Sequence, residues 1–60
     1  MEVEVKLKNG ETVKFTGDRV DVLDFENEGI NYKQIRYFRK GFSKSVYIEK
    51  ESIKNIMERP

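Results

Sequence analysis

Apolar and polar residues alternate along the first sixteen positions of the chain. Strict alternation is typical of half-buried β-strands, because successive side chains of a strand point to opposite faces. An Asn9-Gly10 pair interrupts the alternation, and such a pair between two alternating runs predicts a β-hairpin. The apolar positions of the two runs are Val3, Val5, Leu7, Val13 and Phe15.

The length of the hairpin loop follows from the same pattern. A two-residue loop at Asn9-Gly10 would place Val5 opposite Lys14 and so put the apolar residues of the two strands on different faces. A three-residue loop, Lys8–Gly10, places Val5 opposite Val13 instead. A slip of one residue reverses every side chain of a strand, so the apolar pattern decides the register. We predict the three-residue loop, with its glycine in the left-handed position of a G1 bulge.

The apolar positions change parity inside each of the next two runs. In residues 19–25 the change falls after Val22, and in residues 30–39 it falls after Tyr32. A change of parity within one strand predicts a bulge or a bend that moves the strand between layers. A polar turn at residues 26–29 separates the two runs.

The last third of the chain contains one clear turn and one ambiguous segment. Lys40-Gly41 predicts a second hairpin turn, and residues 46–48 a further short strand. Apolar residues recur three and four positions apart within residues 50–58, a spacing that favours a short helix. The same segment also fits a 3₁₀ turn at residues 50–52 followed by a last short strand, and both alternatives stay open.

About five short strands within 60 residues resemble, in architecture, the SH3-like and Sm-like small barrels. We therefore predict one mainly β domain over residues 1–60. It is a small bent antiparallel sheet or such a barrel, with a short C-terminal helix or a 3₁₀ turn plus strand. Frequent β-branched and aromatic residues and the absence of Ala agree with this fold class. The predicted core consists of Val3, Val5, Leu7, Val13, Phe15, Val20, Val22, Ile35, Val46, Ile48, Ile53 and Ile56.

The composition argues against catalysis and against a bound cofactor. Without Cys or His the chain has no disulfide, no thiolate or imidazole metal ligand, and no imidazole to activate a hydroxyl nucleophile. The four glycines are dispersed, so no phosphate-binding loop forms. The acidic stretch from Asp24 matches a calcium loop at its first positions, but Ile35 stands where a bidentate Glu is required. We expect no enzyme activity, no metal, no cofactor and no small-molecule substrate.

The absence of Cys, of an apolar membrane span and of a signal peptide leads us to expect a cytoplasmic protein without a membrane partner. Frequent Lys and Ile with no Ala suggest a low-GC bacterium or its phage as the source.

Charge is distributed unevenly although the net charge is only +1. Residues 18–29 carry five acidic residues against one basic residue, whereas residues 30–45 carry five basic residues and no acidic one. Aromatic residues are interleaved with these basic residues, and such a combination suits a binding surface. The candidate partner-binding residues of this hairpin, 32–44, are Tyr32, Lys33, Arg36, Tyr37, Arg39, Lys40, Phe42 and Lys44.

Four interpretations of this basic and aromatic hairpin are open. The favoured function is binding of a protein partner, as a small regulator or inhibitor does. The alternative is single-stranded nucleic acid or RNA, whose phosphates attract cations and whose bases stack on aromatic rings. The basic segment would also complement the acidic segment of a second copy in a two-fold dimer. Finally, the hairpin is simply solvated if its rings point inward.

Overall fold

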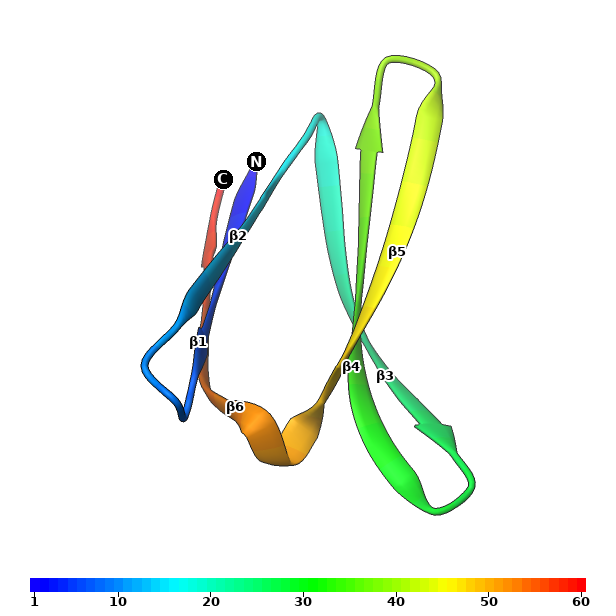
Figure 1. The fold of residues 1–60 in the computed structure, drawn as a ribbon. Coiled ribbons are helices and arrows are strands. Elements are labelled where there is room, and N and C mark those ends of the chain that lie inside the picture. The colour runs from blue at the N-terminus through cyan, green and yellow to red at the C-terminus, as the bar shows by residue number, and fades with distance from the viewer.

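The structure is a computed structural model that describes residues 1–60, and it consists of two antiparallel sheets of three strands each. Figure 1 shows the sheets facing one another, with the β2–β3 connection at one end and η1 at the other. One sheet has the order β2-β1-β6 and the other the order β3-β4-β5. The elements are β1 (Glu2–Leu7), β2 (Thr12–Thr16), β3 (Arg19–Asn27), β4 (Ile30–Arg39), β5 (Phe42–Glu49), the 3₁₀ turn η1 (Lys50–Ser52) and β6 (Ile53–Arg59).

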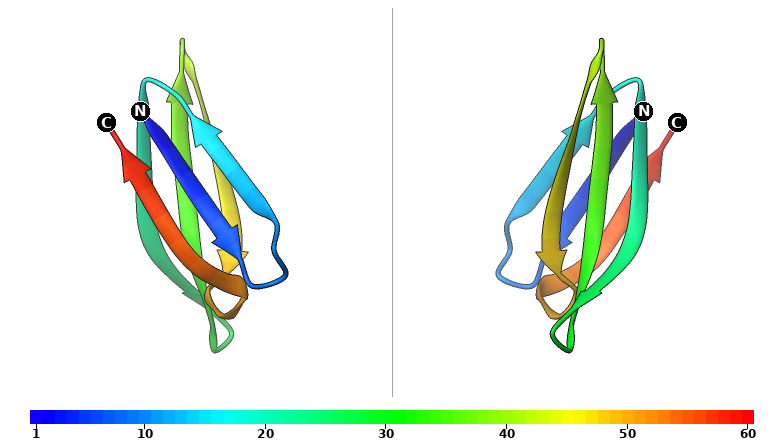
Figure 2. Two further views of the ribbon diagram at one scale, coloured as in Figure 1. Left: turned by 90° about the vertical axis from the view of Figure 1, so that its left-hand side faces the viewer. Right: turned by 90° about the vertical axis from the view of Figure 1, so that its right-hand side faces the viewer.

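The mainly β fold class is confirmed, and the closed barrel is not. The two sheets remain separate, and Figure 2 shows them stacked as two layers whose strands cross at an angle. Short connections carry the chain from one layer to the other at both ends. Because no strand of one sheet pairs with a strand of the other, each layer keeps two free edges. No helix of the structure combines the length and the apolar character needed to cross a membrane.

The β1–β2 hairpin has the predicted three-residue loop. Val5 pairs with Val13. The amide of Gly10 donates to the carbonyl of Leu7 at 3.0 Å, and Gly10 has a φ of +96°. The glycine therefore occupies the left-handed position that closes a type I turn and a G1 bulge.

The C-terminal helix favoured by the apolar spacing is wrong, and the alternative of a 3₁₀ turn plus strand is correct. In β6 the pairing shifts: Asn55 pairs with Lys6, whereas Ile53 pairs with Leu7, so the residue between them has no partner. This bulge brings Ile53 and Ile56, three positions apart, onto the same inner face. In a bulged strand, apolar residues that share a face can therefore have the three-residue spacing that is typical of a helix.

The predicted bulge or layer-changing bend in β3 and β4 is also absent. These strands pair without a register shift from the Arg19–Phe38 pair to the Asn27–Ile30 pair. Val22 faces the other sheet, and Leu23 faces away from it. The tip of the β3–β4 hairpin extends beyond the facing sheet (Figure 1). By the register, Leu23, Phe25 and Ile30 lie on the face that points away from that sheet. The parity change therefore marks a sheet with apolar residues on both faces.

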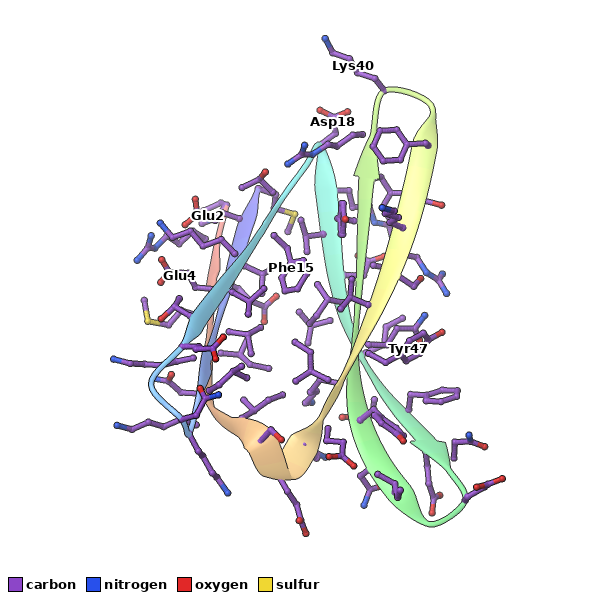
Figure 3. The ribbon with its side chains drawn as sticks, viewed as in Figure 1. Glu2, Glu4, Phe15, Asp18, Lys40 and Tyr47 are labelled. Atoms are coloured by element: carbon purple, nitrogen blue, oxygen red, sulfur yellow. The ribbon has the colours of Figure 1, made fainter.

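The core lies between the sheets and is small. Its five buried apolar side chains are Val3, Val5, Phe15, Val20 and Ile35. Figure 3 shows Phe15 in the space between the layers. The other seven predicted core residues pack around this cluster and remain partly buried. Tyr37 packs there as well, with its ring centre 5.8 Å from that of Phe15.

Candidate binding surface

The face of sheet β3-β4-β5 that points away from β2-β1-β6 is called the outer face. Paired residues of antiparallel strands share a face, so the register assigns the outer side chains in rows across β3, β4 and β5. The rows run Arg19–Phe38–Ser43, Asp21–Arg36–Ser45, Leu23–Gln34–Tyr47 and Phe25–Tyr32–Glu49.

An aromatic patch covers the middle of this face and the end that carries the β3–β4 turn. The ring centre of Phe25 lies 5.0 Å from that of Tyr47 and 6.0 Å from that of Tyr32, in tilted arrangements. Tyr47 points away from the interior of the molecule (Figure 3). All members except the half-buried Tyr32 are exposed. The aromatic patch consists of Leu23, Phe25, Ile30, Tyr32 and Tyr47.

A buried glutamine lies at the centre of the outer face. Gln34 is only 8% exposed although it faces away from the core. Its side-chain amide donates to the hydroxyl of Ser45 at 3.4 Å. The structure contains no buried side-chain polar atom without a hydrogen-bond partner. The bond engages the NH2 group of Gln34, so this donor keeps a partner within the chain when the patch is covered.

Opposite charges occupy the two ends of the outer face. At one end the guanidinium of Arg19 lies 5.5 Å above the ring of Phe38 and pairs with Asp21 at 3.0 Å. Arg36 lies beside this pair, and Glu49 lies at the other end. Neither Arg36 nor Glu49 forms a salt bridge within the chain. The face therefore offers one cation and one anion that are free to pair with a partner.

The opposite broad face, on sheet β2-β1-β6, has a different character. Arg59 bridges to Glu2 at 3.0 Å and to Glu4 at 3.8 Å, and Lys14 bridges to Glu4 at 3.4 Å. Figure 3 shows both glutamates on the outside of this sheet. Met57 is its one large exposed apolar side chain. Charges paired within the chain indicate a solvated face.

The hairpin predicted as the binding surface is divided between the two faces of its sheet. Only Tyr32 and Arg36 lie on the outer face, because neighbouring residues of a strand point in opposite directions. Lys33 lies on the inner side, where its ammonium pairs with Asp24 at 2.7 Å. Tyr37 belongs to the core packing described above.

The remaining predicted residues lie at the other end of β4 and β5. Arg39 and Phe42 form the last pair before the Lys40-Gly41 turn, and Lys44 pairs with Tyr37 on the inner side. Phe42 is exposed there, away from the aromatic patch. These side chains are therefore not continuous with Tyr32 and Arg36.

Arg39 has a structural position at the corner between the sheets. Its Nε donates to the backbone carbonyl of Thr16 at 2.8 Å, and its Nη2 donates to the hydroxyl of the same residue. The amide of Asp18 donates to the carbonyl of Phe38 at 2.9 Å. These bonds attach the β2–β3 connection to the β4–β5 hairpin.

Four members of the aromatic patch are absent from the residues predicted from the sequence, namely Leu23, Phe25, Ile30 and Tyr47. Two of them could have been found from the alternation of apolar residues along β3. Once the first two valines of that strand are assigned to the core, Leu23 and Phe25 must point to the other face. Their apolar character then marks that face as a candidate contact surface.

The ion pairs around Asp24 give a prediction on pH. A hydrogen bond from Lys33, with the charges of Lys33 and Lys50, holds the pKa of Asp24 below its usual 3.8. The folded state thus releases this proton more readily than the unfolded chain. The stabilisation is complete above the unfolded pKa and is lost as the pH falls through the lowered folded pKa.

We expect NMR titration of the Asp24 carboxyl to show the lowered pKa, and Lys33→Met to raise it towards 3.8. Lys54→Met on β6 serves as the control and leaves the pKa unchanged. An unchanged pKa of Asp24 in Lys33→Met would contradict the assignment.

No group of three or more carboxylates is close enough to hold a metal ion. Comparisons with protein-family models, with curated proteins and with solved structures found no match to this chain. The fold and the outer face therefore carry the functional argument.

Proposed function

We propose that this chain is a non-enzymatic protein-binding module whose contact surface is the outer face of sheet β3-β4-β5. The exposed aromatic patch is the observation that supports the proposal. Protein interfaces are enriched in Tyr, Phe and Arg at their centres, where these side chains exclude water. Of the surface predicted on hairpin 32–44, the proposal keeps Tyr32 and Arg36, and it adds the rest of the aromatic patch.

The partner's chemistry follows from the arrangement of the outer face. Apolar side chains would cover the rings of Phe25 and Tyr47, and a carboxylate would pair with Arg36. A regulator or inhibitor that acts by covering a protein surface needs no more than this. The cytoplasmic location, the bacterial or phage source and the resemblance in architecture to SH3-like domains belong to the same proposal and rest on composition and strand pattern.

Single-stranded nucleic acid is the second candidate. Guanidinium groups beside aromatic rings, as at Arg19 and Phe38, suit phosphates and stacked bases. Against this, the net charge is +1 and the outer face also carries Asp21 and Glu49. Acidic groups on the contact surface oppose the counterion release that drives nucleic-acid binding.

Tyr47→Glu tests the proposed face, and Met57→Glu provides a matched control. The two residues are 49% and 43% exposed and lie on opposite broad faces. We expect immobilised wild-type protein and Met57→Glu to capture the same partner from a cell lysate, and Tyr47→Glu to lose it. Circular dichroism checks that both variants are folded. Equal capture by all three proteins would contradict the proposal.

A labelled oligonucleotide separates the second candidate from the first. Fluorescence anisotropy is measured at about 50 and 200 mM salt, where phosphate contacts produce a steep salt dependence. We expect no binding at micromolar protein. Binding that weakens sharply with salt and disappears in Arg36→Glu would replace the protein partner with nucleic acid.

A further inference from the structure

We infer that the partner of the outer face is a second copy of this chain, bound through the same face in a two-fold symmetric dimer. The inference rests on the proposed function, since it uses the same surface and names what covers it. Three observations carry it: the small core, the self-complementary order of side chains on the outer face, and the modest share of the surface that a dimer interface needs.

The chain exposes more large apolar side chains than it buries. Five apolar residues form the buried core, whereas seven large apolar side chains are at least 40% exposed. A 60-residue domain has little buried surface with which to offset the entropy of ordering its chain. Covering the patch with an identical patch removes apolar surface from water in both copies and favours the folded state by mass action.

A two-fold axis fits the rows of the outer face. If the axis lies in the interface along the row Leu23–Gln34–Tyr47, it places each of these residues near its own symmetry mate. The same rotation lays each strand antiparallel over its counterpart. The row that contains Arg36 then faces the partner row that contains Tyr32 and Glu49. Twisted sheets stack face to face in this way about 10 Å apart.

The charges of the two rows are complementary in this arrangement. Arg36 lies over the ring of Tyr32 in the second copy, and Glu49 is one strand further across, about 4.8 Å away. A guanidinium on its long stem reaches both the ring and the carboxylate. Symmetry makes the contact twice, as an isologous interface requires.

Two further polar groups of the face are already bonded within the chain. Asp21 is paired with Arg19 within its own chain, and Gln34 is hydrogen-bonded to Ser45. Each therefore keeps one bond within its own chain when water is excluded. A net charge of +1 on each copy produces little repulsion between them.

A specific interface needs only a modest share of the surface of this chain. Stable complexes bury about 800 Å² on each partner. The chain exposes 4394 Å² in total, so the interface would use less than a fifth of the surface. The right-hand view of Figure 2 shows the outer face, which runs along the full length of β3, β4 and β5.

Sedimentation equilibrium from micromolar to millimolar protein tests the dimer. We expect wild type and Met57→Glu to dimerise with the same constant and Tyr47→Glu to be monomeric. Arg36→Glu and Glu49→Arg each bring like charges together twice, and we expect each to weaken the dimer by at least about tenfold.

An equimolar mixture of Arg36→Glu and Glu49→Arg tests the geometry. In the mixed dimer one contact is Glu with Arg and the other is the native Arg with Glu, so association recovers. A monomeric wild type overturns the inference, and so does a dimer that Tyr47→Glu leaves intact or a mixture that does not recover. The capture and oligonucleotide experiments judge the proposed function independently, since a different protein captured through Tyr47 supports that function whether or not the chain dimerises.

Discussion

Replacing Ile35 with alanine is expected to lower the free energy of unfolding by about 2–5 kcal/mol. Ile35 is fully buried at the centre of the β3-β4-β5 sheet and belongs to a core of only five buried apolar residues. The neighbouring strands hold the backbone in place, so the structure cannot collapse fully into the space left behind. The core of so small a domain rarely supplies more than about 3–5 kcal/mol of net stability. Urea denaturation followed by circular dichroism measures the loss, and a large fraction of the variant is expected to be unfolded in buffer.

Ile35→Val is the matched control for this prediction. It removes a single methylene and keeps the β-branched shape, so we expect a loss of about 0.5–1.5 kcal/mol. Equal losses in the alanine and valine variants would show that the side chain is not the centre of the core.

Replacing Gly17 with alanine is expected to destabilise the fold by about 1–3 kcal/mol or more, through a steric conflict at the corner between the sheets. An added Cβ would lie 2.6 Å from the backbone carbonyl oxygen of Phe38. That oxygen is held by the amide of Asp18, and Arg39 binds Thr16 beside it. The neighbour is backbone within a hydrogen-bonded corner, so the structure must shift to admit a methyl group. Thermal and urea denaturation both measure the effect.

Gly29→Asn is the control for the corner. Gly29 lies in a hairpin turn with a φ of +79° and has nothing within 4 Å of an added Cβ. Asparagine tolerates this conformation, so we expect a change of about 0.5 kcal/mol or less. The steric explanation fails if Gly17→Ala is as stable as Gly29→Asn.

The register of the β1–β2 hairpin could be predicted to the residue because two signals in the sequence agree there. The apolar alternation of both strands and the Asn9-Gly10 pair admit only one register that keeps Val5 and Val13 on the same face. The tail lacked such agreement. Ile53 and Ile56 have helical spacing, and only the pairing of β6 with a strand more than forty residues away reveals that a bulge produces it. A pairing between residues so distant in sequence cannot be recognised from the residues of the tail alone.

The binding surface was predicted less well for a related reason. Charge clustering along the chain does not distinguish the two faces of a strand. Arg36 and Arg39 are three residues apart and point to opposite faces, so only Arg36 remains available on the outer face. The guanidinium of Arg39 is instead hydrogen-bonded within the chain to Thr16, which lies in another strand. The closed barrel was wrongly predicted because the number of strands does not show whether the edge strands of the two sheets pair with one another.

The position of β1 between β2 and β6 has a consequence for how the chain reaches its native state. The β1–β2 hairpin and the β3–β4–β5 meander join segments that are adjacent in sequence, so they form with short loop closures. The β1–β6 pairing joins opposite ends of the chain and carries a larger entropic cost. We therefore expect β6 to dock last. On the ribosome, β1 would keep an open edge until residues 53–59 emerge, and the nascent chain would be most prone to aggregation during that interval.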